Sequence, residues 1–284
     1  MSKKKILFIN PIGSPQFDDS MARILDEAKD AETSVDVVSL KRGPHHVEYH
    51  YYESIVLADL LHLVKKAEND GYDASVLGCF YDLGLEESRE ISERMVVTAP
   101  AESCMLLACS LGTTFSIIVG RRKWIPQMMS NVVRYGLKDR LASFKALDLG
   151  VLDFQQDKDE TERRQVQAVD EAIKKDGAEV IILGCTAEFG FWKTLQRKFG
   201  VPVLDPVVTP FKYAEYLVNL REMFGWSHSK IGAFESPPIE EIADWKIARD
   251  YGTDVWNNNY ENTKRKLTSN KPPLVRKNGN RKTA

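Results

Sequence analysis

The chain has few cysteines, no long apolar run and almost no net charge. Its 284 residues include four cysteines, and the formal net charge is −2 at pH 7. No apolar run approaches the roughly 20 residues that cross a bilayer, and balanced charge gives no electrostatic signal for nucleic-acid binding. The sequence has neither a C-x-x-C pair nor a glycine-rich phosphate loop. We therefore expect no membrane or nucleic-acid partner, no metal and no cofactor.

The N-terminus lacks the pattern of a secretory signal. Lys3–Lys5 precede a short apolar run, Ile6–Ile9, which stops at Asn10 and Pro11. Such a run is too short for the apolar core of a signal peptide and predicts a first strand instead. Four cysteines without a secretory signal indicate a reducing compartment and free thiols. We expect a cytoplasmic protein.

Strand-like and helix-like stretches alternate over most of the chain. Short apolar runs predict buried parallel strands, and the amphipathic stretches between them predict helices. This alternation is typical of an α/β protein with parallel sheets. The predicted elements include a strand at Phe144–Val151 and helices at Leu85–Met95 and Glu188–Phe199, as well as a long helix at Tyr49–Asn69 with Ile55 facing inward.

The pattern changes near the C-terminus. Strand signals stop at Gly225, and eight residues between Lys264 and Ala284 are Lys or Arg. This composition predicts a C-terminal extension that ends in a solvated basic tail. A tail that lies on a neighbouring subunit, or one that binds nucleic acid, is the alternative.

One pattern occurs twice, at an offset of 106 residues. Residues 70–79 and 176–185 share Asp, Gly, Leu, Gly and Cys at matching places, so Cys79 corresponds to Cys185. The same offset matches Asp82 with Glu188, three residues after each cysteine. Two halves of the chain therefore look like copies of one unit.

Each copy places its cysteine where a buried strand stops. Ligands of open α/β sheets bind at the carboxyl ends of the strands. The glycine before each cysteine is expected to let the backbone turn sharply. A helix that follows would place its positive end near the sulfur and favour the thiolate over the thiol. Cys79 and Cys185 could then face each other across a cleft and exchange protons with the two faces of one carbon atom.

These motifs resemble the aspartate/glutamate/hydantoin racemase superfamily, and within it the hydantoin and allantoin racemases. The matching stretches, which span about residues 4–225, are Ile6–Pro11 with Ser14, Gly78–Leu85, Ala101–Ser103, Gly184–Ala187 and Val201–Pro206. The resemblance implies two similar α/β lobes related by pseudo-twofold symmetry, with the active site in the cleft between them. It also implies a cofactor-independent enzyme that acts on a small molecule and forms a homo-oligomer. The predicted division is 1–98 plus 206–225, then 99–205, then the extension 226–284.

The candidate catalytic residues are Cys79 and Cys185, one thiolate removing a proton and the opposite thiol returning one. Three kinds of substrate-binding residue are predicted. The amide of Asn10 could orient a carbonyl, and Arg121 could bind an anionic substituent. Backbone N–H groups could stabilise an enolate at Phe80, Tyr81, Thr186 and Ala187. Asp82 and Glu188 are interpreted as carboxylates that cap helices. The other two cysteines, Cys104 and Cys109, are interpreted as core residues.

The function predicted is a racemase or epimerase acting at a carbon next to a carbonyl, on a hydantoin-like cyclic ureide. The alternatives are an amino-acid racemase of the aspartate or glutamate type, and a related decarboxylase or cis–trans isomerase. An alternative of another class is a two-lobe ligand sensor or a thiol redox switch. Exchange of a substrate proton with solvent deuterium separates the enzymes from the sensor.

Overall fold

The structure is a computed structural model that describes residues 3–256. One compact unit reaches to Ser236, and a second begins at Pro237. The first sheet and its helices comprise β1 (Lys4–Asn10), α1 (Asp18–Ala28), β2 (Thr33–Ser39), α2 (His50–Asn69), β3 (Ala74–Leu77), α3 (Leu85–Ile91) and β4 (Val96–Thr98). The elements that follow are α4 (Pro100–Leu111), β5 (Phe115–Val119), η1 (Arg122–Trp124), α5 (Ile125–Arg134), η2 (Lys138–Arg140), β6 (Leu141–Ala146), α6 (Lys158–Asp176), β7 (Val180–Leu183), η3 (Thr186–Glu188), α7 (Trp192–Phe199), β8 (Val203–Leu204) and α8 (Val208–Phe224). The second unit contains α9 (Ile239–Asp244) and α10 (Ile247–Asp250).

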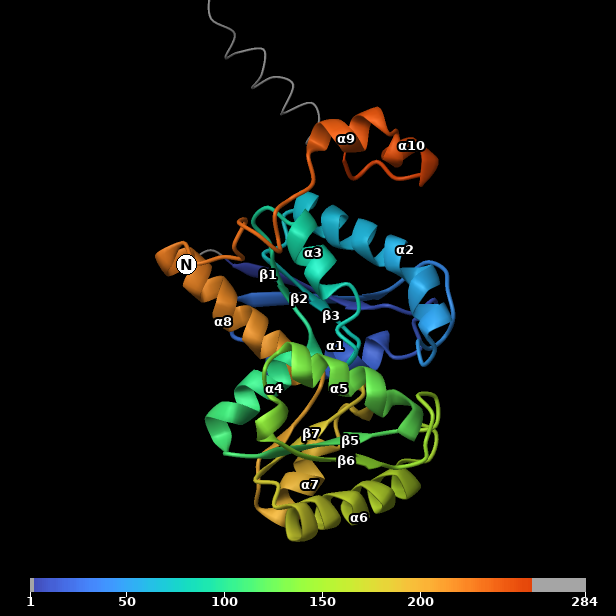
Figure 1. The fold of residues 1–284 in the computed structure, drawn as a ribbon, viewed down its shortest axis with the longest axis vertical. Coiled ribbons are helices and arrows are strands. Elements are labelled where there is room, and N and C mark those ends of the chain that lie inside the picture. Colours follow the sequence, from blue (N-terminus) through green and yellow to red (C-terminus); the bar gives the residue numbers. More distant parts are fainter. Residues whose placement is uncertain (1–2, 257–284) are drawn as a thin grey trace, which may run out of the picture. The chain divides into compact units, whose positions relative to one another are not determined.

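Two parallel four-stranded sheets form the first unit, each in its own lobe (Figure 1). Their strand orders are β2-β1-β3-β4 and β6-β5-β7-β8, which is the same order in corresponding strands. Strands β3 and β7 are buried along their whole length, as expected for parallel strands covered on both faces. The predicted α/β class with two similar parallel-sheet lobes is confirmed.

Two helices cross between the lobes. Helix α4 follows β4 of the first sheet and packs on β7 of the second, whereas α8 follows β8 and packs back on β3 and β4. Each helix starts at a carboxylate: Asp82 accepts the N–H groups of Ala101 and Glu102, both at 2.8 Å, and Asp205 Oδ1 accepts that of Val207 at 2.8 Å. The crossing helices join the lobes into one compact unit. The predicted domain limits stay a prediction.

Three predicted elements have different limits. The strand predicted at Phe144–Val151 lies at Leu141–Ala146, because the chain turns away after it and Asp148 has a positive φ of 56°. The helix predicted from Glu188 begins at Trp192, because Gly190 (φ 87°) interrupts it. The helix predicted at Leu85–Met95 stops at Ile91. On α2, Ile55 is exposed rather than inward-facing.

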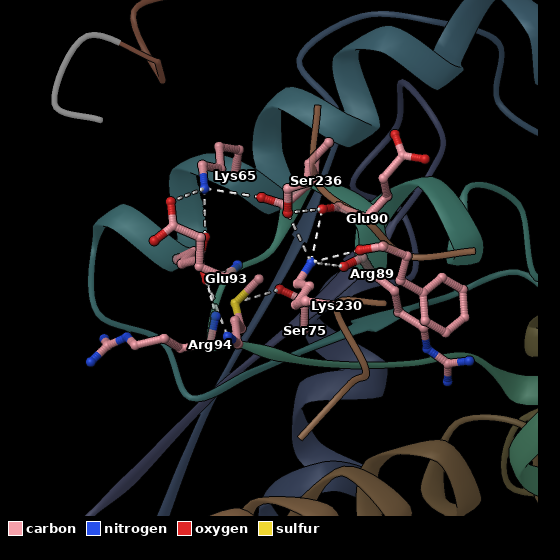
Figure 2. A network of polar contacts seen from close by, with 12 residues as sticks. Lys65, Ser75, Arg89, Glu90, Glu93, Arg94, Lys230 and Ser236 are labelled. Atoms are coloured by element: carbon pink, nitrogen blue, oxygen red, sulfur yellow. Dashed lines mark hydrogen bonds and ion pairs between the residues drawn. The ribbon is translucent and has the colours of Figure 1, made fainter. Parts of the chain in front are cut away.

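The segment after α8 returns over the edge of the first sheet (Figure 2). Lys230 Nζ donates to the carbonyls of Arg89 at 2.7 Å and Glu90 at 2.9 Å, two of the last carbonyls of α3. Such carbonyls have no partner within the helix. His228 Nε2 accepts the N–H of Val97, at the free edge of β4, at 2.9 Å. Residues 226–236 thus cap a helix and cover a sheet edge, although the sequence there has no strand signal.

The second unit is short in the described part of the chain, where α9 and α10 each span less than two turns. The predicted basic tail, Lys264 to Ala284, lies outside the described residues. Across residues 3–256 the helices are all too short or too polar to cross a membrane.

The His228 contact predicts a pH-dependent contribution to stability. Burial, and then the charges of Arg89 and Lys230, lower the pKa of His228 from 6.5 to about 3. Below pH 6.5 the unfolded chain therefore binds a proton at His228 that the folded chain does not bind. The contribution of neutral His228 to the free energy of unfolding is thus complete above pH 6.5 and is lost as the pH falls. In urea titrations, the free energy of unfolding of the parent should fall between pH 7 and pH 5 by about 1 kcal/mol more than that of His228→Gln. This figure is reduced from the full value of the pKa shift because His228 is partly exposed to solvent. The exposed His45 provides the control, since His45→Gln should keep the parent's pH dependence. Equal drops for the parent and His228→Gln would refute the assignment.

Candidate active site

A cavity lies where the two lobes meet, at the carboxyl ends of β1, β3 and β7. The space between its lining atoms, including solvent at its mouth, is about 540 Å³. Both repeat cysteines and five of the six predicted substrate-binding residues line it. The lining comprises Asn10, Pro11, Ile12, Phe17, Met21, His46, Val47, Glu48, Gly78, Cys79, Phe80, Tyr81, Trp124, Met128, Val151, Gly184, Cys185, Thr186 and Ala187.

Each cysteine is placed by a glycine that presses against the neighbouring strand. The N–H of Gly78 donates to Ile9 O, and the N–H of Gly184 donates to Ile118 O, both at 2.7 Å. A Cβ at Gly78 would lie 2.9 Å from Ile9 O, and one at Gly184 would lie 2.7 Å from Ile118 O. Neither glycine has a positive φ. Close backbone approach is therefore what requires glycine at both places; the predicted sharp turn is present at Gly78, where the N–H of Cys79 donates to Leu77 O at 2.9 Å.

The two cysteine motifs are joined directly across the lobes. Thr186 Oγ1 donates to the carbonyl of Gly78 at 3.0 Å. The backbone N–H of Tyr81 hydrogen-bonds to the sulfur of Cys79 and lowers its pKa, and that of Ala187 does the same for Cys185. The repeat thus gives both thiols the same local donor, two residues further along the chain. The predicted role of these N–H groups toward a substrate enolate stays a prediction.

The predicted preference for thiolate is wrong for the thiols as the structure holds them. Burial is the largest cause that raises the pKa of Cys79, with smaller contributions from the charges of Glu53 and Asp82. Burial also raises the pKa of Cys185 well above its ordinary value, followed by the charge of Glu188. The helix predicted at Glu188–Phe199 begins only at Trp192, seven residues after Cys185, and the three-residue 3₁₀ helix η3 (Thr186–Glu188) is what directly follows the cysteine. Desolvation therefore outweighs the helix and backbone dipoles.

The two carboxylates that follow the cysteines have different partners. Asp82 caps α4 and also accepts a hydrogen bond from the hydroxyl of Tyr135 at 2.7 Å, while burial raises its pKa to about 7. Glu188 accepts from Gln165 Nε2 at 3.0 Å, and burial raises its pKa to about 8. Asp82 is a helix cap as predicted, but of α4 and not of the next helix, α3. Glu188 binds α6 instead of capping a helix.

Comparison with known proteins assigns the family. The sequence model of the family described as Asp/Glu/Hydantoin racemase matches residues 6–214. The chain belongs to the Asp/Glu/hydantoin racemase family. It is 33% identical to a hydantoin racemase of Pseudomonas sp. (strain NS671), over 84% of this chain and 93% of that protein, and 34% identical to one of Paenarthrobacter aurescens, over 82% and 97%. Its structure is similar to that of an allantoin racemase from Klebsiella pneumoniae, with a TM-score of 0.77, 28% identity and coverage of 83% and 94%. The resemblance noted in the sequence is confirmed.

Two predicted binding residues of this family member are engaged by protein groups. Asn10 lines the cavity, and its Nδ2 donates to Asp18 Oδ1 at 2.6 Å, so one amide hydrogen is used inside the first lobe. Arg121 does not line the cavity. Its guanidinium donates to Glu48 Oε2 at 3.0 Å and is 42% exposed. The structure thus places Arg121 behind a carboxylate that itself faces the cavity.

Sequence reasoning missed the second wall of the cavity. His46, Val47 and Glu48 come from the loop between β2 and α2, and Trp124 and Met128 come from η1 and α5. This loop has no hydrophobic period, and no repeat partner marks it. The feature of the sequence that could have predicted this wall is the position of His46–Glu48 in the loop after a predicted strand, since active-site residues of α/β proteins often lie in such loops.

The other two cysteines lie on α4, where Cys104 is fully buried and Cys109 is half-buried. Neither lines the cavity. Within residues 3–256, no group of three or more His, Cys, Asp or Glu side chains is arranged to hold a metal ion.

The raised pKa values predict how the cavity thiols react. Alkylation by iodoacetamide requires the thiolate, whose fraction rises tenfold per pH unit below the pKa. The rate of modification of Cys79 and Cys185, followed by peptide mass spectrometry, should keep rising through pH 9.5. A short terminally blocked peptide with one cysteine, which has the ordinary thiol pKa of about 8.5, should level off over the same range. A plateau below pH 8 for either cavity cysteine would contradict the thiol state derived from burial.

Proposed function

We propose that the protein is a cofactor-independent racemase of 5-substituted hydantoins, which are five-membered cyclic ureides. The family supports a racemase, and the relatives described above are a hydantoin racemase from each of two bacteria and an allantoin racemase. The observation that carries the proposal is the placement of Cys79 and Cys185, from opposite lobes, on one cavity.

The reaction needs one base and one acid on opposite faces of the ring carbon. In one direction, the thiolate of one cysteine takes the proton from C5, and the electron pair moves into the adjacent carbonyl to give an enolate. The thiol of the other cysteine then delivers its proton to the opposite face of C5. The roles of Cys79 and Cys185 are exchanged for the other enantiomer, and no electron leaves the substrate.

The cavity supports a neutral ring over a free amino acid. An amino acid brings a carboxylate, which needs fixed hydrogen-bond donors, and an ammonium, which needs an acceptor, and no Lys or Arg lines the cavity to pair with the carboxylate. Aromatic and aliphatic groups such as Phe17, Phe80 and Met128 dominate the lining instead. A ureide ring also carries amide-type groups that Asn10 and backbone groups can satisfy. The C5–H of a hydantoin is more acidic than the Cα–H of an amino-acid anion, so a thiolate is a sufficient base.

The substrate is a small molecule on this proposal. The homo-oligomer and the cytoplasmic location remain predictions.

The two-thiol scheme predicts the effect of removing either sulfur. Cys79→Ser and Cys185→Ser should each lower racemisation of a 5-alkyl hydantoin, because a hydroxyl is a far weaker acid than a thiol. The loss should be at least the roughly 10²–10⁴-fold contribution of a positioned acid or base. Optical rotation and solvent-deuterium incorporation at C5, followed by NMR, measure it.

The matched control is Cys109→Ser, a half-buried cysteine outside the cavity, which should keep parental turnover. Full activity in Cys185→Ser would refute the scheme. If deuterium exchange occurs only in aspartate or glutamate and in no hydantoin, the protein is an amino-acid racemase that uses the same two thiols.

A further inference from the structure

One carboxylate of the cavity has no place in the proton transfers described above. Glu48 lies in the loop before α2, and its side chain is 5% exposed. The groups that hold it come from the other lobe: the N–H of Val151 donates to Oε1 at 3.0 Å, and Arg121 donates to Oε2 at 3.0 Å. The residue therefore bridges the lobes while it lines the cavity.

The carboxylate keeps acceptor capacity for a ligand. A carboxylate offers about four lone-pair sites, and these two hydrogen bonds use one site on each oxygen. His46 is also close, with Nδ1 3.8 Å from Oε1, but this nitrogen accepts the backbone N–H of Glu48 at 3.4 Å. Among the described residues, Arg121 is the one whose guanidinium donates to Glu48.

The charge of Glu48 reaches the reacting groups. Burial is the main cause that raises the pKa of Cys185 and of Tyr81, and the charge of Glu48 adds a smaller contribution to each. No Lys or Arg lines the cavity to offset it on that side. A second anion entering this cavity would meet a like charge on a side chain that is only 5% exposed, where solvent screens less than at the surface.

We propose that Glu48 is the specificity-determining residue of this cavity, accepting a ring N–H of a neutral cyclic ureide and rejecting substrates that carry an anionic 5-substituent. The inference rests on the proposed racemase function and narrows its substrate class. The sequence predicted that Arg121 binds an acidic substituent. The structure supports the opposite preference, because Arg121 does not line the cavity and is paired with Glu48. A ring held through its N–H would present C5 to the thiols of the two lobes.

The test compares two substrates that differ only in charge. Hydantoin-5-acetamide is neutral, and hydantoin-5-acetate carries a carboxylate at the same place. The kcat/KM for deuterium incorporation at C5 should favour the amide at least 100-fold in the parent. In Glu48→Gln this ratio should fall at least tenfold, with kcat/KM for the amide reduced and that for the acetate increased.

Two further variants separate charge from lobe bridging. Glu48→Asp keeps the carboxylate and should keep a preference for the amide. Arg121→Gln removes the bridge but leaves the charge, so its preference should equal or exceed the parental one. A ratio in Glu48→Gln equal to the parental ratio overturns the inference, as does a loss of preference in Arg121→Gln that matches the loss in Glu48→Gln.

The same measurements keep the two proposals apart. If the parent exchanges neither substrate, nor any 5-alkyl hydantoin, the racemase function fails and the role of Glu48 fails with it. If the parent exchanges the amide while Glu48→Gln retains parental selectivity, only the role of Glu48 fails.

Discussion

Burial of two thiols in one cavity is the constraint on which the rest of the structure depends. A thiol carries its proton when desolvated, so both sulfurs can serve as acids, and a sulfur must lose its proton before it can serve as a base. Proton transfer at one carbon atom also requires the two sulfurs to line the same cavity, so the strand ends that carry them must meet closely. Gly78 and Gly184 permit it, because a side chain at either would press into the backbone of the adjacent strand. The glycines are thus part of the site although they touch no reacting atom.

Holding the two cysteines together requires contacts that fix one lobe against the other. Helices α4 and α8 each follow a strand of one lobe and pack on the sheet of the other, and the hydrogen bond from Thr186 to Gly78 joins the two cysteine motifs. Further bonds across the boundary are those from Asn131 to the carbonyl of Tyr81 and from Gln127 to Glu53. Three of the bonded residues, Gly78, Tyr81 and Thr186, line the cavity, so contacts that stabilise the compact unit also hold the two cysteine motifs against each other.

The sequence predicts this architecture well where a pattern repeats and poorly where it does not. The offset of 106 residues locates both cysteines, and the apolar runs locate the buried strands. The same offset pairs Asp82 with Glu188, yet one caps α4 and the other binds α6 through Gln165, because the partners come from elements outside the repeat window. The role of Glu48 could not be predicted for a related reason. Its hydrogen-bond donors, Val151 and Arg121, lie 103 and 73 residues away in sequence. The thiol state was misjudged because burial, which dominates it, is a property of the folded cavity.

The two halves of the cavity are similar in backbone and different in side chains. Cys185 has the carboxyl groups of Glu188 and Glu48 near it, whereas Cys79 has those of Glu53 and Asp82. For a substrate with one stereocentre, the two enantiomers have equal free energy in water, so kcat/KM must be the same in both directions of racemisation. Unequal thiols therefore affect kcat and KM in compensating ways, and the enantiomer that binds more tightly turns over more slowly. The repeat supplies two proton-transfer groups, and the divergence around them determines which enantiomer the cavity holds longer.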